Sequence, residues 1–351
     1  MARPTLEELG SRRSLLGARF IGLMRWTAAT VGATAVAGSA ALTWAAVEAR
    51  RPTLRRFTIE VPSRPGLEKM NILHVSDLHM FDRQKFIPKF LKRVADTEHI
   101  DLVVSTGDNL GAEDAAPLLL EALEPLLSKP GVFVLGSNDY YSPDMKAWTS
   151  YLDPSHQKET AQEKGSQHPD LPWFQVVQAL KEAGWVDLSN QAHNLRVPLA
   201  SPPSDSGQVN GSQPDGREAL VSAIGVDDPH ILRDHMPEPT KKWRKGRGLR
   251  LALTHSPYLR VLDEFAAADA DLVLAGHTHG GQIRVPGFGA LVNNTDIPRK
   301  YSRGMHRWHG LRRGPNPWLH VSAGLGTSKY APIRFSCRPE VSLITVCPTG
   351  K

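Results

Sequence analysis

The segment from Leu272 to Gln282 constrains this chain more than any other, because an apolar run ends there in a turn of glycines and histidines. Residues Leu272 to Ala275 are apolar and predict a short buried strand that ends at Gly276. His277 and His279 follow one residue apart, and an extended backbone would point both side chains into one cavity. Imidazole is the commonest protein ligand for transition metals. A solvated polar turn is the alternative, which a His-x-His pair without partners elsewhere would favour.

Similar polar residues follow other apolar runs of the chain. The runs that predict strands are Met70–Ser76, Asp101–Thr106, Gly131–Leu135, Ala219–Val226 and Leu249–Leu253. Helical periodicity at 84–97 and 114–127 separates the first of them, and this alternation indicates an α/β layered domain. The metal-binding types at the strand ends are Asp77, His79, Asp108, Asn138, His255, His277 and His279. Ligands bind at the carboxyl edge of such sheets, so we expect these side chains to converge.

The mixture of carboxylate, imidazole and amide groups indicates a particular chemistry. It suits divalent Mn, Fe, Zn or Co. Seven candidate ligands are too many for one ion with open positions, so two divalent ions that share a carboxylate fit better. Paired metals hold the attacking and leaving oxygens of a phosphoryl displacement, and they lower the pKa of bound water.

In this order, the motifs Asp-x-His, Gly-Asp, a Gly-Asn-His-Asp-like turn, His and Gly-His-x-His resemble the calcineurin-like metallophosphoesterases. The chain is most similar to bacterial membrane-associated or exported members of the YkuE type, over about residues 70–346. The resemblance implies a four-layer α/β/β/α sandwich and hydrolysis of a phosphomonoester, phosphodiester or pyrophosphate by metal-hydroxide attack. It also implies a first metal on Asp77, His79, Asp108 and His279, with Asp108 bridging to a second metal on His255, His277 and an amide oxygen.

The third motif departs from the family pattern. Where the family has Gly-Asn-His-Asp, this chain has Gly136, Ser137, Asn138 and Asp139. Aligned without gaps, Ser137 replaces the amide ligand, and Asn138 replaces the histidine that helps to protonate the leaving group. A local shift of the turn would instead make Asn138 the ligand. His230, in an Asp-Asp-Pro-His sequence, is a candidate for the missing proton donor, and a surface turn is its alternative reading.

Composition limits the other classes of function. The chain has 351 residues and a formal charge of +6, with basic runs around Trp243 and from Arg299 to Arg313. These runs suit an anionic substrate or anionic lipid, or they form solvated loops. No interleaved aromatic and basic pattern indicates a nucleic-acid groove, so we expect no nucleic-acid partner. Cys337 and Cys347 are the only cysteines, which excludes a cysteine zinc site and leaves one disulfide or two thiols.

The N-terminal part has a different character from the rest. Residues 1–25 are basic and resemble a twin-arginine signal. Residues 26–47 contain no charged residue and are long enough for a bilayer span of ~20 residues. We expect a transmembrane or signal-anchor helix, with the main domain outside the cytoplasm, or export after cleavage. The phosphoesterase domain is expected at 57–348, with polar insertions near 143–172 and 201–217.

These observations together predict a membrane-tethered phosphoesterase with a phosphorylated small-molecule or lipid-linked substrate. The altered turn favours an alternative, a catalytically weak or inactive metal-binding module at the cell envelope. A soluble cytoplasmic phosphatase is a third hypothesis. The sequence leaves the oligomeric state open.

Overall fold

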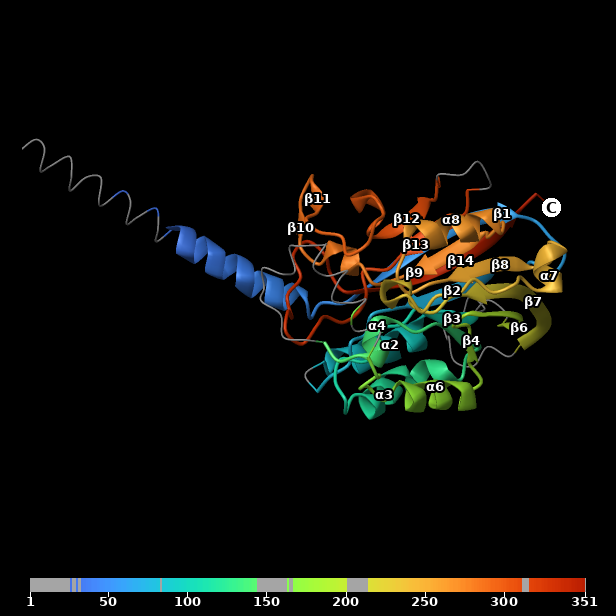
Figure 1. The fold of residues 1–351 in the computed structure, drawn as a ribbon, viewed down its shortest axis with the longest axis horizontal. Helices are drawn as coiled ribbons and strands as arrows, with labels where there is room; N and C mark the ends of the chain where they lie inside the picture. Colours follow the sequence, from blue (N-terminus) through green and yellow to red (C-terminus); the bar gives the residue numbers. More distant parts are fainter. Residues whose placement is uncertain are drawn as a thin grey trace, which may run out of the picture. The chain divides into compact units, whose positions relative to one another are not determined.

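The computed structural model describes residues 26, 30, 33–82, 84–143, 163, 167–200, 214–310 and 316–350, without the side chains of 200, 214 and 215 (Figure 1). The chain divides into two units, Met1–Val47 and Glu48–Lys351. Residues 33–47 of the first unit are helical, whereas the expected basic segment at 1–25 lies outside the described residues, as does part of the expected span at 26–47. Within the described residues, no helix combines the length and the apolar character needed to cross a bilayer.

The first sheet of the second unit has the strand order β1-β14-β2-β3-β4-β5 (Figure 1). Its strands are β1 (Thr53–Pro62), β14 (Glu340–Thr349), β2 (Met70–Val75), β3 (Leu102–Ser105), β4 (Gly131–Phe133) and β5 (Val186–Asp187). Strands β2 to β5 run parallel, and β14 joins β2 in antiparallel pairing. Three helices pack on its outer face: α2 (Phe86–Thr97), α3 (Ala116–Leu127) and α6 (Trp173–Glu182). The central strands are mostly apolar, because both of their faces are covered, and His74 on β2 is a buried polar exception.

The second sheet has the order β12-β13-β9-β8-β7-β6. Its strands are β12 (Gly304–Arg307), β13 (Trp318–Val321), β9 (Leu272–Ala275), β8 (Leu249–Leu253), β7 (Pro214–Gly225) and β6 (Gln191–Ala200). Strands β13, β9, β8 and β7 run parallel, and the two outer strands are antiparallel. Helices α7 (Lys241–Arg244) and α8 (Leu259–Ala267) pack on its outer face. The smaller elements are α4 (Ser137–Tyr140), η2 (Pro229–Ile231), η3 (His279–Gly281), η4 (Arg299–Tyr301) and the hairpin β10 (Arg284–Val285) and β11 (Gly289–Ala290).

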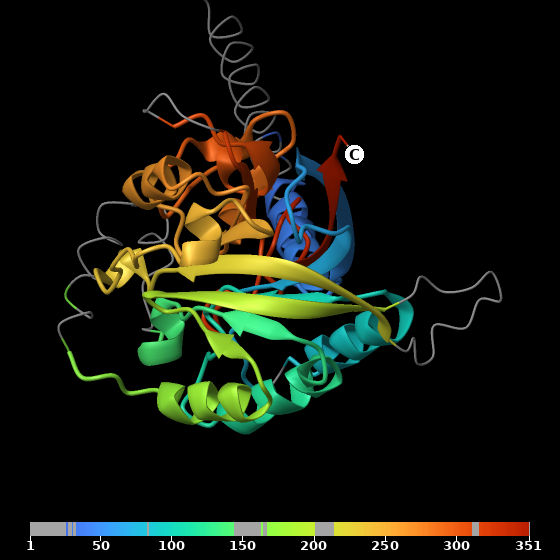
Figure 2. The same cartoon turned by 90° about the vertical axis from the view of Figure 1, so that its right-hand side faces the viewer.

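Figure 2 shows the layers of helices and sheets, and three apolar cores lie between them. One lies between the first sheet and α2, α3 and α6, the second between the two sheets, and the third between the second sheet and α8. Alternation along β2 shows the principle, because Ile72 enters the core between the sheets whereas Leu73 enters the core under the helices. The predicted α/β class is therefore confirmed, and the layers follow in the order helix, sheet, sheet, helix.

The predicted strands and helices are found close to their expected positions. Strands β8 and β9 have the expected bounds, and α2 and α3 begin two residues later than predicted. Strands β1 and β6 were not predicted. The polar insertions expected near 143–172 and 201–217 fall mostly on residues outside the described part, and residues 214–217 of the second begin β7. Cys337 and Cys347 are both free thiols, which decides against a disulfide between them.

The parallel strands of both sheets bring their carboxyl ends to a common edge, where the chain is packed very tightly. Gly136, between β4 and α4, shows this best. A Cβ atom on Gly136 would lie 2.3 Å from Asp108 Oδ1 and 2.7 Å from the ring of His255. Its φ of −117° is open to any residue, so space alone requires glycine here.

We predict that Gly136→Ala separates the turn from Asp108 and His255 and lowers the divalent metal content of the purified protein. The matched control is Gly184→Ala, where φ is +90° and no atom lies within 4 Å of the new Cβ. That control carries backbone strain of about 1 kcal/mol without a clash at the edge. Metal content is measured by elemental analysis after loading with Mn²⁺. Equal metal content in both variants would contradict the prediction.

Candidate metal centre

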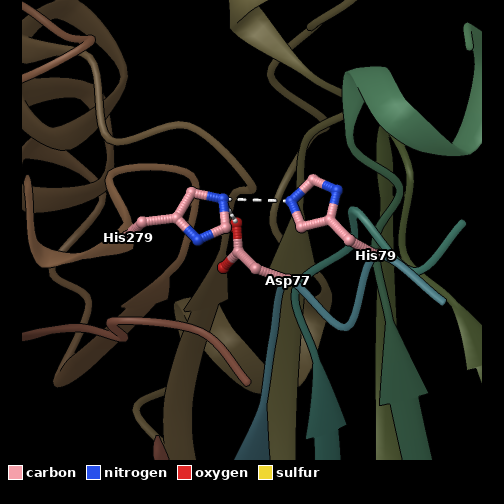
Figure 3. A group of neighbouring side chains, drawn as sticks. All are labelled: Asp77, His79 and His279. Carbon is pink, nitrogen blue, oxygen red and sulfur yellow. Dashed lines mark hydrogen bonds and ion pairs between the residues drawn. The ribbon is translucent and has the colours of Figure 1, made fainter. Parts of the chain in front are cut away.

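Six of the predicted ligands form two groups at the shared edge of the sheets. Asp77, His79 and His279 make the first group, and Asp108, His255 and His277 make the second. Within each group, one potential ligand atom from every residue lies within 4.8 Å of the others. Figure 3 shows the first group, in which the two imidazole rings face each other beside the Asp77 carboxylate.

The first group closes around a small space. His79 Nε2 lies 3.0 Å from His279 Nε2, and His279 Nε2 lies 3.6 Å from Asp77 Oδ1 (Figure 3). His79 Nε2 is also 3.6 Å from Oδ2 of Asp108. The Asp77 carboxylate is held from behind, since the backbone N–H of His277 donates to its Oδ1 at 2.9 Å. A carboxylate and two imidazoles at these separations are a ligand set for a transition metal.

The second group is more deeply buried, and its donor atoms test whether a cation fits. His255 Nδ1 lies 2.7 Å from the carbonyl of Thr106, and donation along this contact leaves Nε2 as the atom that takes a proton or a metal. That Nε2 lies 3.2 Å from Asp108 Oδ1. Among the described residues, Nε2 of His255 and Nε2 of His277 are buried without a hydrogen-bond partner. Two such nitrogens beside a carboxylate fit a divalent cation, which would satisfy all three.

Burial sets the charge of these ligands. It lowers the pKa of His79 to about 4 and holds the pKa of His277 and His279 well below the ordinary value, so the rings are neutral at physiological pH. Burial opposes ionisation of both Asp108 and His255, but their mutual attraction outweighs it, so the pKa of Asp108 lies well below and the pKa of His255 well above its ordinary value. Three neutral imidazoles and an ionised carboxylate are in the forms that bind metals, and a cation at the second group would replace the proton of His255.

The backbone at the ligands corrects one prediction. Asp77, His79, Asp108, His277 and His279 all have positive φ, between 42° and 67°. The extended conformation expected for the His277–His279 turn is therefore wrong, and the two rings enter different groups rather than one cavity. Non-glycine residues rarely adopt this left-handed region, and such strain concentrates at functional sites.

Two supporting residues were not recognised in the sequence. The carboxylate of Asp139 accepts from the backbone N–H groups of Asp108, Asn109 and Gly136 at 2.8–2.9 Å, and it thereby joins the turns after β3 and β4. The position of Asp139 in the Gly136–Asp139 motif was the sequence feature that could have indicated this role. The fully buried Arg334 lies with Nη2 3.1 Å from Nδ1 of His279. Arg334 stands outside every motif, so no local pattern points to it.

The remaining candidates are Asn138, Ser137 and His230. Asn138 reaches the second group, since its backbone N–H and its Nδ2–H each donate to Asp108 at 2.8 Å. His230 is largely buried, with its ring centroid 4.5 Å from that of His277 and its Nδ1 2.8 Å from the hydroxyl of Tyr258. The structure thus brings Asn138 and His230 to the edge that carries the six ligands.

Comparison with known proteins agrees with this geometry. The family model for calcineurin-like phosphoesterases matches residues 70–281, which include all six residues of the two groups. The chain is 27% identical over 292 residues to the uncharacterized metallophosphoesterase YkoQ of Bacillus subtilis, covering 81% of this chain and 87% of that protein. It is 33% identical over 138 residues to the uncharacterized metallophosphoesterase YkuE of the same organism, covering 39% and 43% of the two chains.

A further relative is the phosphodiesterase YaeI of Escherichia coli, which is 37% identical over 100 residues, or 27% of this chain and 31% of that protein. The matched family model spans more than half of the chain. The convergence of its ligands and these similarities lead to one conclusion: this chain belongs to the calcineurin-like phosphoesterases and is a hydrolase that acts on phosphoester bonds.

Proposed function

We propose that this chain hydrolyses a phosphomonoester, phosphodiester or pyrophosphate bond at a centre of two divalent metal ions, drawn from Mn, Fe, Zn and Co. The observation that carries the proposal is the position of Asp108 between the two groups. Its Oδ1 lies 3.2 Å from His255 Nε2, and its Oδ2 lies 3.6 Å from His79 Nε2. One carboxylate that reaches both groups can serve as the shared ligand of a metal pair.

In this proposal the residues have separate roles. Asp77, His79 and His279 hold one metal, and His255 and His277 hold the other. When bound, such a metal pair polarises phosphoryl oxygens and lowers the pKa of water. We assign the amide role at the second metal to Asn138 rather than Ser137, because the Nδ2–H of Asn138 donates to Asp108 Oδ2 at 2.8 Å, which keeps the amide beside the shared carboxylate with its oxygen as the candidate ligand.

We predict that Asp108→Asn removes the shared charge, reduces bound Mn²⁺ from two ions to one or none, and lowers hydrolysis of bis-p-nitrophenyl phosphate. The loss should exceed the ~10–100-fold that follows removal of an outer partner of a ligand. Asp96→Asn is the control, because Asp96 pairs with Lys92 on the exposed face of α2 and its side chain is 57% exposed. Metal content and initial rates are measured on the same samples.

The same experiment separates the enzyme from the alternative function. A metal-binding module without catalysis is favoured by one observation, the absence of histidine from the turn Gly136–Asp139. Wild-type protein that binds two metals and cleaves no ester would support that module. Turnover that disappears in Asp108→Asn would support the enzyme.

We further propose that His230 donates the proton to the leaving oxygen, in place of the histidine that the turn lacks. Its ring packs against the metal-ligand candidate His277 at 4.5 Å between centroids, and Tyr258 holds its Nδ1. General acid help is worth ~10²–10⁴-fold when the leaving group is poor. It is worth little for aryl esters, whose leaving oxygen needs no proton.

We predict that His230→Gln slows hydrolysis of an alkyl phosphate ester by ~10²–10⁴-fold and changes p-nitrophenyl ester hydrolysis far less. The control is His235→Gln, because His235 is exposed and its Nδ1 contacts the carbonyl of Arg233. The measurement is kcat/KM for both esters at saturating Mn²⁺. Equal slowing of both esters would show that His230 does not act on the leaving group.

We propose that the chain is attached to a cell membrane through residues 26–47, with its phosphoesterase unit outside the cytoplasm. A feature of that unit supports a substrate held at a lipid surface. The hairpin β10–β11 exposes Val285, Phe288 and Leu291, and the guanidinium of Arg299 lies 4.9 Å from the ring centroid of Phe288. Apolar side chains flanked by cations are typical of contact with anionic lipid.

The hairpin is also connected to the first metal group. Arg284 Nη1 donates to the carbonyl of Gly280 at 2.7 Å, and Gly280 directly follows His279. The hairpin is thus attached to the turn that carries His279.

We predict that an environment-sensitive dye at Phe288→Cys shifts to the blue when the full chain is placed in vesicles of phosphatidylcholine with phosphatidylglycerol. The same dye at Phe174→Cys is the matched control, since the two phenylalanines are 62% and 63% exposed and Phe174 lies on α6. Cys347→Ser removes the more accessible native thiol. Identical emission at the two positions would contradict contact between the hairpin and lipid.

A further inference from the structure

A continuous line of buried polar side chains connects the two sheets with the first metal group. It starts at His320 on β13, whose Nδ1 lies 2.9 Å from Nδ1 of His74 on β2. His74 Nε2 lies 2.9 Å from Thr106 Oγ1, and Thr106 Oγ1 lies 2.7 Å from Ser76 Oγ. Ser76 Oγ lies 2.5 Å from Oδ2 of Asp77. The relative exposure of all five side chains is 0%. We call these five residues the polar column.

The number of protons in the column determines its direction. An ionised Asp77 can only accept, so the single hydroxyl proton of Ser76 is donated to it. Ser76 therefore accepts from Thr106, and the hydroxyl of Thr106 must in turn accept from His74 Nε2–H. His74 then has a lone pair on Nδ1, which accepts from Nδ1–H of His320. Every hydrogen bond in the column points toward Asp77.

Burial keeps both histidines neutral, as this direction requires. It lowers the pKa of His74 to about 3 and holds the pKa of His320 well below its ordinary value. The direction also leaves Nε2 of His320 as a lone pair, and this atom has no hydrogen-bond partner among the described residues. The pair thus has a specified tautomer on each ring, Nε2–H on His74 and Nδ1–H on His320.

Stability alone does not explain the column. The core between the sheets consists of aliphatic side chains around this line, and an unsatisfied buried nitrogen costs ~1–3 kcal/mol. Apolar residues of similar shape in place of both partners of such a bond can be nearly neutral or stabilising. A polar line that costs stability and ends on a metal-ligand candidate indicates a role at that ligand.

Thr106 connects the column with the second metal group as well. Its hydroxyl belongs to the column, and its carbonyl lies 2.7 Å from Nδ1 of His255. One residue therefore orients a ligand candidate in each group. Outer partners of this kind set the rotation of a ligand and its basicity.

We propose that His320 and His74, acting through Thr106 and Ser76, are positioning residues that hold the ionised carboxylate of Asp77 for metal binding. With Oδ2 engaged by Ser76 and the backbone N–H of His277 on Oδ1, the carboxylate keeps one orientation toward His279. The inference rests on the proposed metal centre and extends it into the core between the sheets.

The first test compares Thr106→Val with Thr106→Ser in the full chain, titrated with Mn²⁺ by calorimetry. Valine keeps the shape of the side chain and the carbonyl that contacts His255, but it removes the hydroxyl. Serine keeps the hydroxyl and the carbonyl and loses only the methyl group. We expect Thr106→Val to weaken the affinity of one of two Mn²⁺ ions by ~10–100-fold and Thr106→Ser to restore it to within about threefold of wild type. Ser76→Ala, which removes only the donor to Asp77, should reproduce the valine variant and replaces it if that variant does not fold.

The second test reads the direction of the column without metal or turnover. Nitrogen-15 NMR of histidine-labelled full chain, with His74→Gln and His320→Gln used for assignment, distinguishes the two neutral tautomers. We expect Nε2–H on His74 and Nδ1–H on His320. Identical tautomers on the two rings, or a protonated ring at neutral pH, would contradict the proposed direction of the hydrogen bonds in the polar column.

The two tests separate this inference from the proposed function. If the wild-type protein and Thr106→Val both bind two Mn²⁺ ions with equal affinities, the positioning role is overturned and the metal centre is left intact. Wild-type protein that binds no Mn²⁺ would overturn the metal centre and the positioning role together, even with the expected tautomers.

Discussion

Asp108 is buried where the edges of the two sheets meet, and the polar contacts of the site are arranged around its charge. Burial opposes a negative charge, yet Asp108 stays ionised because its attraction to His255, whose own pKa is raised, outweighs the cost of burial. Asn138 gives it two hydrogen bonds, and His255 and His79 lie within 3.6 Å of its two oxygens. A buried ionised carboxylate is stable only with such partners. The requirement for a positive charge at this position is therefore a property of the fold as well as of the chemistry.

The strained backbone at the ligands is held by hydrogen bonds between neighbouring turns. A left-handed conformation costs about 1–2 kcal/mol for a non-glycine residue, and five ligand candidates adopt it. The turn after β2 is joined to the turn after β3, because the N–H of Asp77 donates to the carbonyl of Gly107 and the N–H of His79 donates to that of Asp108. Asp139 adds two bonds that join the turns after β3 and β4, and a third, from the N–H of Gly136, within its own turn. These contacts let the ligands keep conformations that they would not adopt alone.

The sequence predicts the ligands well because each one follows an apolar run, and the end of a strand can be recognised locally. It predicts the conformation of the same turns poorly, since the left-handed backbone at His277 and His279 depends on packing against the other turns. Contacts between residues that are distant in the sequence cannot be predicted from a local sequence pattern. His74 is fully buried in a strand that the sequence predicts, but its partner His320 lies 246 residues away. The pairing of β1 with β14 is equally distant, and Arg334 has no motif of its own.

Each metal group takes ligands from both sheets, and this couples metal binding to the docking of the sheets. Asp77, His79 and Asp108 follow strands of the first sheet, whereas His255, His277 and His279 follow strands of the second. A cation held by either group would therefore bridge the layers at their edge, where the aliphatic core between the sheets ends. Binding to the folded state alone adds about 2.7 kcal/mol of stability at one hundred times the Kd. The polar column crosses the same interface from His320 to Asp77, so the alignment of the sheets and the orientation of a ligand depend on one set of contacts.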